Sequence, residues 1–400
     1  MVVELFSWGG YLGRVLSLGD PGKAWEENLS YDAVVIGGGV VGVATAYELV
    51  RLGVKTILID RQDVGRATDA GAGIISAGED PNHPDPYYRF VGLAELHYKD
   101  LVRNLEADGA EETGYAVCGS LWVAIDERET AEFNRSTYGL PEGDGTSDGP
   151  VLVTPDRARE IFPPLGDVKG AVYSPATARV DGRQLASALE SAALSRGLEK
   201  RSKSVETVSS DGNVSTITMD DGETVEAGNA VIAGGAWSEA FSDQLSVDIP
   251  VGPQRGQIVH LDVGDVDTSS WPILTGLTEH YMVSWPDQRV VVGATREADV
   301  GYNPVTSVEG VIEVLYEAIR VAPSLKSAMI REIRVGLRPL SRDGMPIVGT
   351  LPGHKNVQVV TGHGSMGLHL GPYSGKVVAD AVATGTWPSE MAAFGVERFM

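Results

Sequence analysis

The chain has 400 residues and carries 55 acidic against 32 basic side chains, a formal net charge of −23. This charge argues against binding to nucleic acid or to anionic membrane surfaces, because both are polyanions. The hydrophobic fraction of 42% is ordinary for a globular chain, and the length suits two domains. With Cys118 as its single cysteine, the chain has no intrachain disulfide or cysteine-rich metal site.

Two expectations about the surroundings of the protein follow from the composition. No run of about 18 apolar residues occurs, and no basic patch precedes an apolar core near residue 1, so we expect no transmembrane segment and no secretory leader. We therefore expect a cytoplasmic protein. The acid excess favours a halophilic habitat, where ions screen the repulsion between carboxylates; a plain acidic surface is the alternative.

The first predicted elements follow an N-terminal extension, residues 1–30, which is either a frayed segment or a surface anchor or oligomer arm. Residues 31–60, YDAVVIGGGVVGVATAYELVRLGVKTILID, then give a strand, a glycine turn, a helix and a second strand. Gly37, Gly39 and Gly42 form G-x-G-x-x-G, which permits a tight turn, a close pyrophosphate and close helix packing. Asp60 ends the second strand, where an acid accepts hydrogen bonds from a ribose. This order predicts a dinucleotide-binding unit whose helix N-terminus faces the phosphates.

Segments of this type alternate along the rest of the chain with blocks richer in antiparallel strand. A helix is predicted at 88–107, strands at 114–125, an amphipathic helix at 181–197 and antiparallel strands from 249 to 295. A helix at 306–320, strands at 331–337 and 357–361, and a helix at 366–384 follow. The pattern predicts an α/β fold with two discontinuous domains. The nucleotide domain takes residues 31–84, 181–244 and 331–400, and a mostly antiparallel β substrate domain takes 85–180 and 245–330.

Three further segments resemble the D-amino-acid oxidase/glycine oxidase/sarcosine oxidase superfamily of FAD-dependent amine oxidoreductases. They are ATDAGAGIIS (67–76), VGLRPLSRDGMPIVG (335–349) and TGHGSMGLHLGPYSGKVVADAV (361–382). The resemblance covers residues 31 to about 385 and implies a Rossmann-like FAD-binding domain with an inserted substrate domain. The C-terminal segment has no cysteine, unlike relatives that tether flavin there, so the FAD is expected to be noncovalent. No metal site is expected.

The resemblance and the local chemistry together give a set of expected cofactor residues. Thr68 can donate a hydrogen bond to a phosphate, and the small residues after it let the backbone approach a flat ring. The backbone of Val205 would meet the adenine, although a plain core valine is an equal alternative. The expected cofactor-binding residues are Gly37, Gly39, Gly42, Asp60, Thr68, Gly71, Gly73, Ile74, Val205, Gly234, Gly362, Gly364, Met366 and Gly367.

Arg338 is the expected substrate-binding residue, because a carboxylate needs a planar bidentate partner and arginine supplies one. By resemblance it holds the carboxylate against the flavin; an ordinary ion pair is the alternative. Tyr281 resembles pocket-lining tyrosines of the family, or else is a packing residue. His363, between two glycines, either approaches the flavin edge or has no catalytic role. Arg296 is a further possible source of positive charge.

The expected activity is therefore FAD-dependent oxidation of an amino acid or related amine by hydride transfer, giving an imine that hydrolyses. A D-amino acid or an N-methyl or secondary amino acid fits this site. Glycine is not favoured, because Ser365 and Met366 stand where some relatives carry a second arginine. The electron acceptor is oxygen or an unknown carrier. An NAD-dependent dehydrogenase and a non-catalytic flavin-binding subunit of a larger dehydrogenase are the alternatives.

Overall fold

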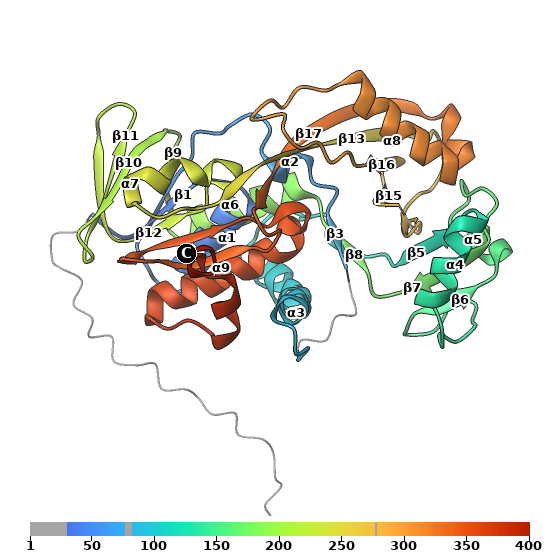
Figure 1. Ribbon diagram of the computed structural model, residues 1–400, viewed down its shortest axis with the longest axis horizontal. Helices are drawn as coiled ribbons and strands as arrows, with labels where there is room; N and C mark the ends of the chain where they lie inside the picture. Colours follow the sequence, from blue (N-terminus) through green and yellow to red (C-terminus); the bar gives the residue numbers. More distant parts are fainter. Residues whose placement is uncertain (1–29, 77–81, 277) are drawn as a thin grey trace, which may run out of the picture.

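The structure is a computed structural model that describes residues 30–76, 82–276 and 278–400. The expected N-terminal extension, apart from residue 30, lies outside the described residues. Two large sheets lie beside each other, the first with the N-terminal strand and the second with the long β13 and β17 (Figure 1). None of the described helices is long and apolar enough to span a bilayer.

The first sheet has a parallel centre, in the order β9, β2, β1, β12 and β19. Its strands are β1 (Tyr31–Ile36), β2 (Thr56–Ile59), β9 (Glu199–Arg201), β12 (Thr224–Ile232) and β19 (His354–Thr361). Antiparallel strands β10 (Val205–Ser210), β11 (Ser215–Met219) and β18 (Ile347–Leu351) extend it. The central strands are β-branched and buried on both faces, as parallel strands covered by helices must be.

Side chains of the first sheet alternate between two cores. Val35 and Leu58 point into a core formed with helices α1 (Val40–Arg51), α3 (Pro86–Ala107), α6 (Gly182–Ser195) and α9 (Gly367–Thr384). Val34 and Ile57 point into the opposite core, which the β10–β11 hairpin, η1 (Gly235–Phe241) and α7 (Ser242–Leu245) complete. This alternation follows from the two-residue period of a strand.

The second sheet has the order β17, β13, β16, β15, β14, β5, β7 and β6. These strands are β5 (Ser120–Ala124), β6 (Val151–Val153), β7 (Gly170–Ser174), β13 (Val251–Asp262), β14 (Ile273–Thr275), β15 (Tyr281–Trp285), β16 (Arg289–Gly293) and β17 (Met329–Ser341). Helix α8 (Val308–Val321) packs Val314 and Ala318 against one face. Ile258, Val283 and Val291 form a separate apolar cluster on the other face, together with Ile74 from the first part of the chain.

Short elements complete the described chain. They are α2 (Ala67–Ala70), β3 (Ile74–Ile75), β4 (Ala116–Val117), α4 (Glu127–Ser136), α5 (Pro155–Ile161), β8 (Ala178–Arg179), η2 (Pro323–Ser327), η3 (Gly364–Met366), η4 (Ser389–Phe394) and η5 (Val396–Phe399). Strands β3, β8 and β4 form a small third sheet between the two large ones.

The packing differs from the sequence-based division of the chain at two segments. Helix α3, assigned to the substrate domain, buries Phe90, Tyr98 and Leu101 in the core of the first sheet, and the Tyr98 hydroxyl donates to the Leu368 carbonyl. Strand β17, assigned from residue 331 to the nucleotide domain, pairs along its length with β13. The expected division rested on order along the chain, whereas these long-range contacts join segments that it separates. The division into two domains remains a proposal.

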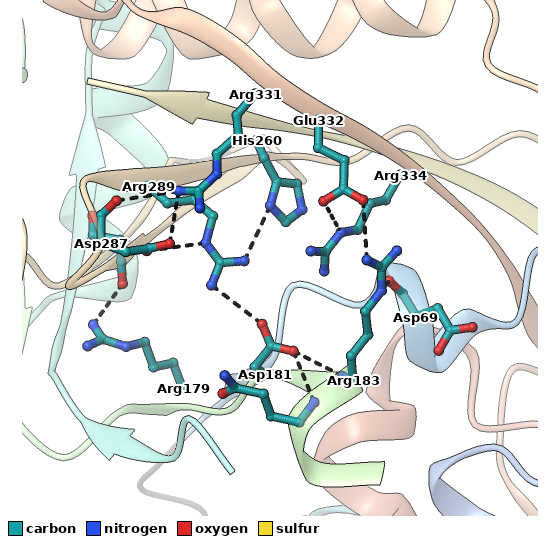
Figure 2. A network of polar contacts seen from close by, with 12 residues as sticks. Asp69, Arg179, Asp181, Arg183, His260, Asp287, Arg289, Arg331, Glu332 and Arg334 are labelled. Carbon is teal, nitrogen blue, oxygen red and sulfur yellow. Dashed lines mark hydrogen bonds and ion pairs between the residues drawn. The ribbon is translucent and has the colours of Figure 1, made fainter. Parts of the chain in front are cut away.

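A network of arginines and acids joins the second sheet to α2 and α6 (Figure 2). Arg289 of β16 pairs with Asp181, whose other oxygen caps the N-terminus of α6. Arg183 of α6 bonds both the Asp69 carbonyl of α2 and Glu332 of β17. Because Glu332 and Arg338 are six residues apart on one strand, they share a face of the sheet. The network therefore fixes one end of the sheet face whose other end carries Arg338.

Candidate functional site

A cavity of about 460 Å³ lies between the two sheets. It is bordered by the ends of β1 and β2, by α2 and β3, by the start of α9, and by β13, β15 and β17. The predicted residues that line it are Gly37, Gly39, Asp60, Thr68, Gly71, Gly73, Ile74, Val205, Gly234, Tyr281, Arg338, His363, Gly364, Met366 and Gly367. Gly42 and Gly362 lie outside its wall, and both have backbone roles.

The glycine turn after β1 has the close contacts that its sequence predicts. Gly37 has φ +107°, and a Cβ on Gly42 would lie 1.9 Å from the Gly37 carbonyl oxygen. Helix α1 begins at Val40 without a side-chain cap from Gly39, so its first N–H groups face the cavity. The Thr68 hydroxyl accepts from the Val40 N–H at 2.9 Å, which leaves the hydroxyl proton free to donate. This arrangement suits a pyrophosphate.

The acid predicted to bind a ribose lies beside the glycine turn. Asp60 is buried, and a Cβ on Gly38 would lie 2.6 Å from its Oδ2. Arg66 donates to that oxygen at 3.1 Å and to Asp69 at 3.1 Å, which holds the carboxylate in place. Val205 and Gly234 line the same end of the wall, beside the stacked rings of Trp237 and Tyr302.

The small residues after α2 are required by the protein's own packing. Gly73 has φ +80°, and a Cβ there would lie 1.7 Å from the Val180 carbonyl oxygen. A Cβ on Gly71 would lie 2.5 Å from Leu368 Cδ1 at the start of α9. These contacts bring the backbone from Gly71 to Ile74 against the cavity, so the glycines serve both packing and access.

The segment before α9 forms another part of the cavity wall. Gly362 and Gly364 have φ of +76° and +54°, and α9 starts at Gly367 without a side-chain cap. The His363 ring is buried; its Nε2 lies 2.8 Å from Ser374 Oγ, and its Nδ1 has no partner among the described residues. Burial lowers the pKa of His363 to about 4, so the ring is neutral at physiological pH.

Arg338 and Tyr281 lie together on the second-sheet side of the cavity. Arg338 Nη1 donates to the Thr295 carbonyl at 2.8 Å, and a Cβ on Gly256 would lie 2.5 Å from the guanidinium. No carboxylate is paired with Arg338 among the described residues, although burial lowers its pKa. Burial raises the pKa of Tyr281, and Arg338 opposes that rise. A half-buried guanidinium with no carboxylate partner among the described residues is suited to bind an anion.

Three residues of the site were not identified from the sequence. Gly256 gives the Arg338 guanidinium its space, Arg66 holds Asp60, and Trp237 lines the Asp60 end of the wall. Arg66 comes six residues after the ribose acid, which is a weak signal. Gly256 has no local signal, because its role depends on pairing of β13 with β17.

The described residues fit FAD by their own geometry. The backbone of Gly38, Gly39 and Gly71 lines the cavity, two helix N-termini face it, and an unpartnered buried nitrogen belongs to His363. No group of three or more metal-ligating side chains occurs in the part of the chain that the structure describes.

Comparison with known proteins gives one family over most of the chain. A family model described as "DAO: FAD dependent oxidoreductase" matches residues 32–381. An "Uncharacterized oxidoreductase YurR" of Bacillus subtilis (strain 168) is 32% identical over 87% of this chain and 94% of its own length. A glycine oxidase of Bacillus licheniformis is 28% identical over 92% of this chain and 97% of its own.

Solved structures show the same similarity. The iminodiacetate oxidase of Chelativorans sp. BNC1 superposes with a TM-score of 0.81 at 32% identity, covering 91% of this chain and 98% of that one. The glycine oxidase of Geobacillus kaustophilus gives a TM-score of 0.80 at 25% identity, covering 92% and 99%. The similarity therefore includes both the nucleotide-binding sheet and the second sheet.

Proposed function

The chain belongs to the DAO family of FAD-dependent oxidoreductases, and from this premise we propose that it oxidises a D-amino acid or an N-methyl or secondary amino acid. Its cofactor is FAD, and its relatives act on amino acids and amines. An NAD-dependent dehydrogenase is thereby set aside. We hold the FAD to be noncovalent, because the C-terminal segment lacks cysteine and Cys118 is not part of the cavity wall.

The proposal rests on the surroundings of the Arg338 guanidinium. Its guanidinium lies in the cavity wall over Gly256 and bonds a backbone carbonyl, with no acid paired to it among the described residues. A substrate carboxylate would supply the missing anion in a bidentate geometry. The Tyr281 side chain beside it would complete the substrate end of the cavity.

The residues near Arg338 favour hydride transfer without a side-chain base. The acids in the cavity wall, Asp60, Asp63 and Glu206, come from the nucleotide end of the site, and His363 is neutral. FAD, when bound, supplies the acceptor for the hydride from the substrate α-carbon. The neutral amine lends its lone pair to form the imine, and loss of its proton completes the two-electron oxidation. Water then hydrolyses the imine to an oxo acid and ammonia or an amine, and oxygen or a carrier takes the electrons.

The first test is the visible spectrum of the purified protein, recorded anaerobically in high salt before and after adding D-amino acids and N-methyl amino acids. We expect a flavin spectrum that bleaches with one of these classes. A flavin that no amine bleaches would instead favour the non-catalytic subunit. Absence of flavin, even after FAD is added, would contradict the assignment of the site.

The assignment of Arg338 has its own test. Arg338→Gln should keep the flavin spectrum and raise the substrate concentration for half-maximal bleaching by about a hundredfold, since charge-assisted hydrogen bonds are lost. Arg338→Lys should recover part of that loss, because it restores charge without bidentate geometry. Arg342→Gln, an exposed arginine paired with Asp248, is the matched control and should change nothing. Equal reduction in all variants would refute the carboxylate assignment.

A further inference from the structure

A second arginine, Arg296, lies in the wall of the cavity that holds Arg338 and Tyr281. It follows directly after Thr295, whose carbonyl accepts from Arg338. Burial lowers the pKa of Arg338 most, and the positive charge of Arg296 lowers it further, so the two guanidiniums act on each other. Two cations thus border one end of a cavity whose wall there carries no carboxylate among the described residues.

The backbone that presents Arg296 is firmly held. Residue 297 forms an antiparallel bridge to Arg255, with N–O distances of 3.0 and 2.9 Å in the two directions. The Glu297 side chain accepts from Arg255, Gln257 and Thr295, on the side of the segment away from the cavity. Because side chains alternate along extended backbone, Thr295 and Glu297 point to that network and Arg296 points to the cavity.

The partner of Arg296 is an easily displaced acid. Arg296 pairs with Glu279, whose side chain is 70% exposed, while the Arg296 side chain is 35% exposed. The negative charge of Glu279 also raises the pKa of Arg338, so Glu279 lies near both arginines. An exposed ion pair of this kind contributes little, about 0–1 kcal/mol, because water solvates both groups when they separate. A carboxylate of a ligand could therefore take the place of Glu279.

We propose that Arg296 is a second anion subsite, and that the preferred substrate is an amino or imino dicarboxylic acid. Arg338 takes the carboxylate next to the reacting carbon, and Arg296 takes the distal one by displacing Glu279. This inference rests on the proposed amine oxidation and specifies its substrate class. It also agrees with the sequence-based expectation that glycine is not favoured, since glycine has no second acid.

The binding test uses the FAD-loaded protein and unreactive acids, so that it does not depend on turnover. Acetate, malonate, succinate and glutarate are titrated while the shift of the flavin spectrum is recorded. We expect one diacid, at the length that matches the two arginines, to bind at least tenfold more tightly than acetate. Equal affinity for acetate and for every diacid would overturn the second subsite.

Variants assign the effect to the two side chains. Arg296→Gln should weaken binding of the diacid about ten- to a hundredfold and leave acetate unchanged. Glu279→Gln should have the opposite effect. The diacid should bind more tightly, because Glu279 no longer competes with it for Arg296. Arg342→Gln, which changes an exposed arginine outside the cavity wall, is the control. An Arg296→Gln variant that binds the diacid as well as the parent protein contradicts the proposal.

Turnover separates this inference from the function on which it rests. Anaerobic bleaching is compared for N-methylglycine, D-alanine, D-aspartate, D-glutamate and iminodiacetate. A preference for diacids that disappears in Arg296→Gln supports both proposals. Bleaching by monocarboxylic amines alone, with Arg296→Gln unaffected, supports the oxidation and overturns the second subsite. If no amine bleaches the flavin, the proposed function fails, and the diacid titration still decides the subsite.

Discussion

At the scale of single residues, the glycines of this site do two separate things. Gly37 and Gly42 are required by the backbone, since the turn needs a positive φ at one and contact with a carbonyl at the other. Gly256 has ordinary backbone geometry and is required only because a guanidinium lies over it. The first kind affects cofactor binding and folding, whereas the second affects only the position of Arg338.

This distinction predicts a selective effect of Gly256→Ala. The new Cβ would lie 2.5 Å from the Arg338 guanidinium, so the side chain must shift away from its Thr295 contact. We expect the substrate concentration for half-maximal reduction to rise about tenfold, because misplacement by a fraction of an ångström is costly at a reacting centre. FAD affinity, measured by flavin fluorescence on dilution, should not change.

Gly252→Ala is the matched control, because it lies four residues earlier on β13 with nothing within 4 Å of an added Cβ. It should behave as the parent protein in both measurements. Weaker FAD binding in Gly256→Ala would show that the glycine serves the cofactor and not Arg338.

At the scale of elements, the network in Figure 2 connects the pieces that must face one another across the cavity. The ion pairs of this network do not contribute equally to stability. The Arg289 and Asp181 side chains are 12% and 10% exposed, whereas those of Arg331 and Asp287 are both 47% exposed. Arg289 also lies over the Trp285 ring and 3.4 Å from His260 Nδ1. Burial therefore makes Arg289, and not Arg331, the important link.

Two arginine variants test this difference. Arg289→Gln should lower the free energy of unfolding by about 3 kcal/mol, because Asp181 stays buried without its partner. Arg331→Gln should lower it by less than about 1 kcal/mol, because its pair is exposed. Urea unfolding of both proteins with FAD bound gives the comparison. Equal losses would show that burial does not rank these pairs.

An element could be predicted from the sequence when the contacts that define it join residues close together in the chain. The β1–α1–β2 unit is set by neighbouring residues, so Gly37, Gly42 and Asp60 identified it. The family resemblance added Arg338. Strand β17 pairs with β13, which lies about 80 residues away in the sequence, so no local pattern shows this partner. For the same reason Gly256 could not be recognised.

At the scale of the whole molecule, the charge of −23 opposes the compact state through self-repulsion. Raising the ionic strength from about 0.1 M to 1 M shortens the screening length from about 10 Å to 3 Å, which relieves that repulsion. The ion pairs that screening weakens are mostly exposed and contribute little. We propose adaptation to high salt on this ground.

A thermal unfolding series in potassium chloride tests the proposal. The midpoint should rise steadily from 0.1 to 2 M salt, because repulsion dominates over the exposed pairs. Sucrose at matched water activity serves as the control for general exclusion of cosolute. A midpoint that falls with salt would indicate that the ion pairs dominate instead.

Acid sensitivity is a second property of the whole molecule, because four of the described histidines are buried. Burial lowers the pKa of His97, His363 and His369 to about 4 and that of His260 to about 3. Their ordinary value is about 6.5, so between these limits the unfolded chain binds protons that the folded protein does not. Stability is therefore full above about pH 6.5 and is lost as the pH falls.

Each histidine contributes a slope of up to about 1.4 kcal/mol per pH unit in that window, and the four together contribute up to about 5.5 kcal/mol per pH unit. Since a folded domain has only about 5–15 kcal/mol in reserve, urea midpoints at constant ionic strength should fall steeply from pH 6.5 to 5. His97→Phe removes one such group, whose Nε2 has no partner among the described residues, and should make the slope shallower by about one quarter. A parent protein equally stable at pH 7 and pH 5 would mean that these rings take up protons in the folded state.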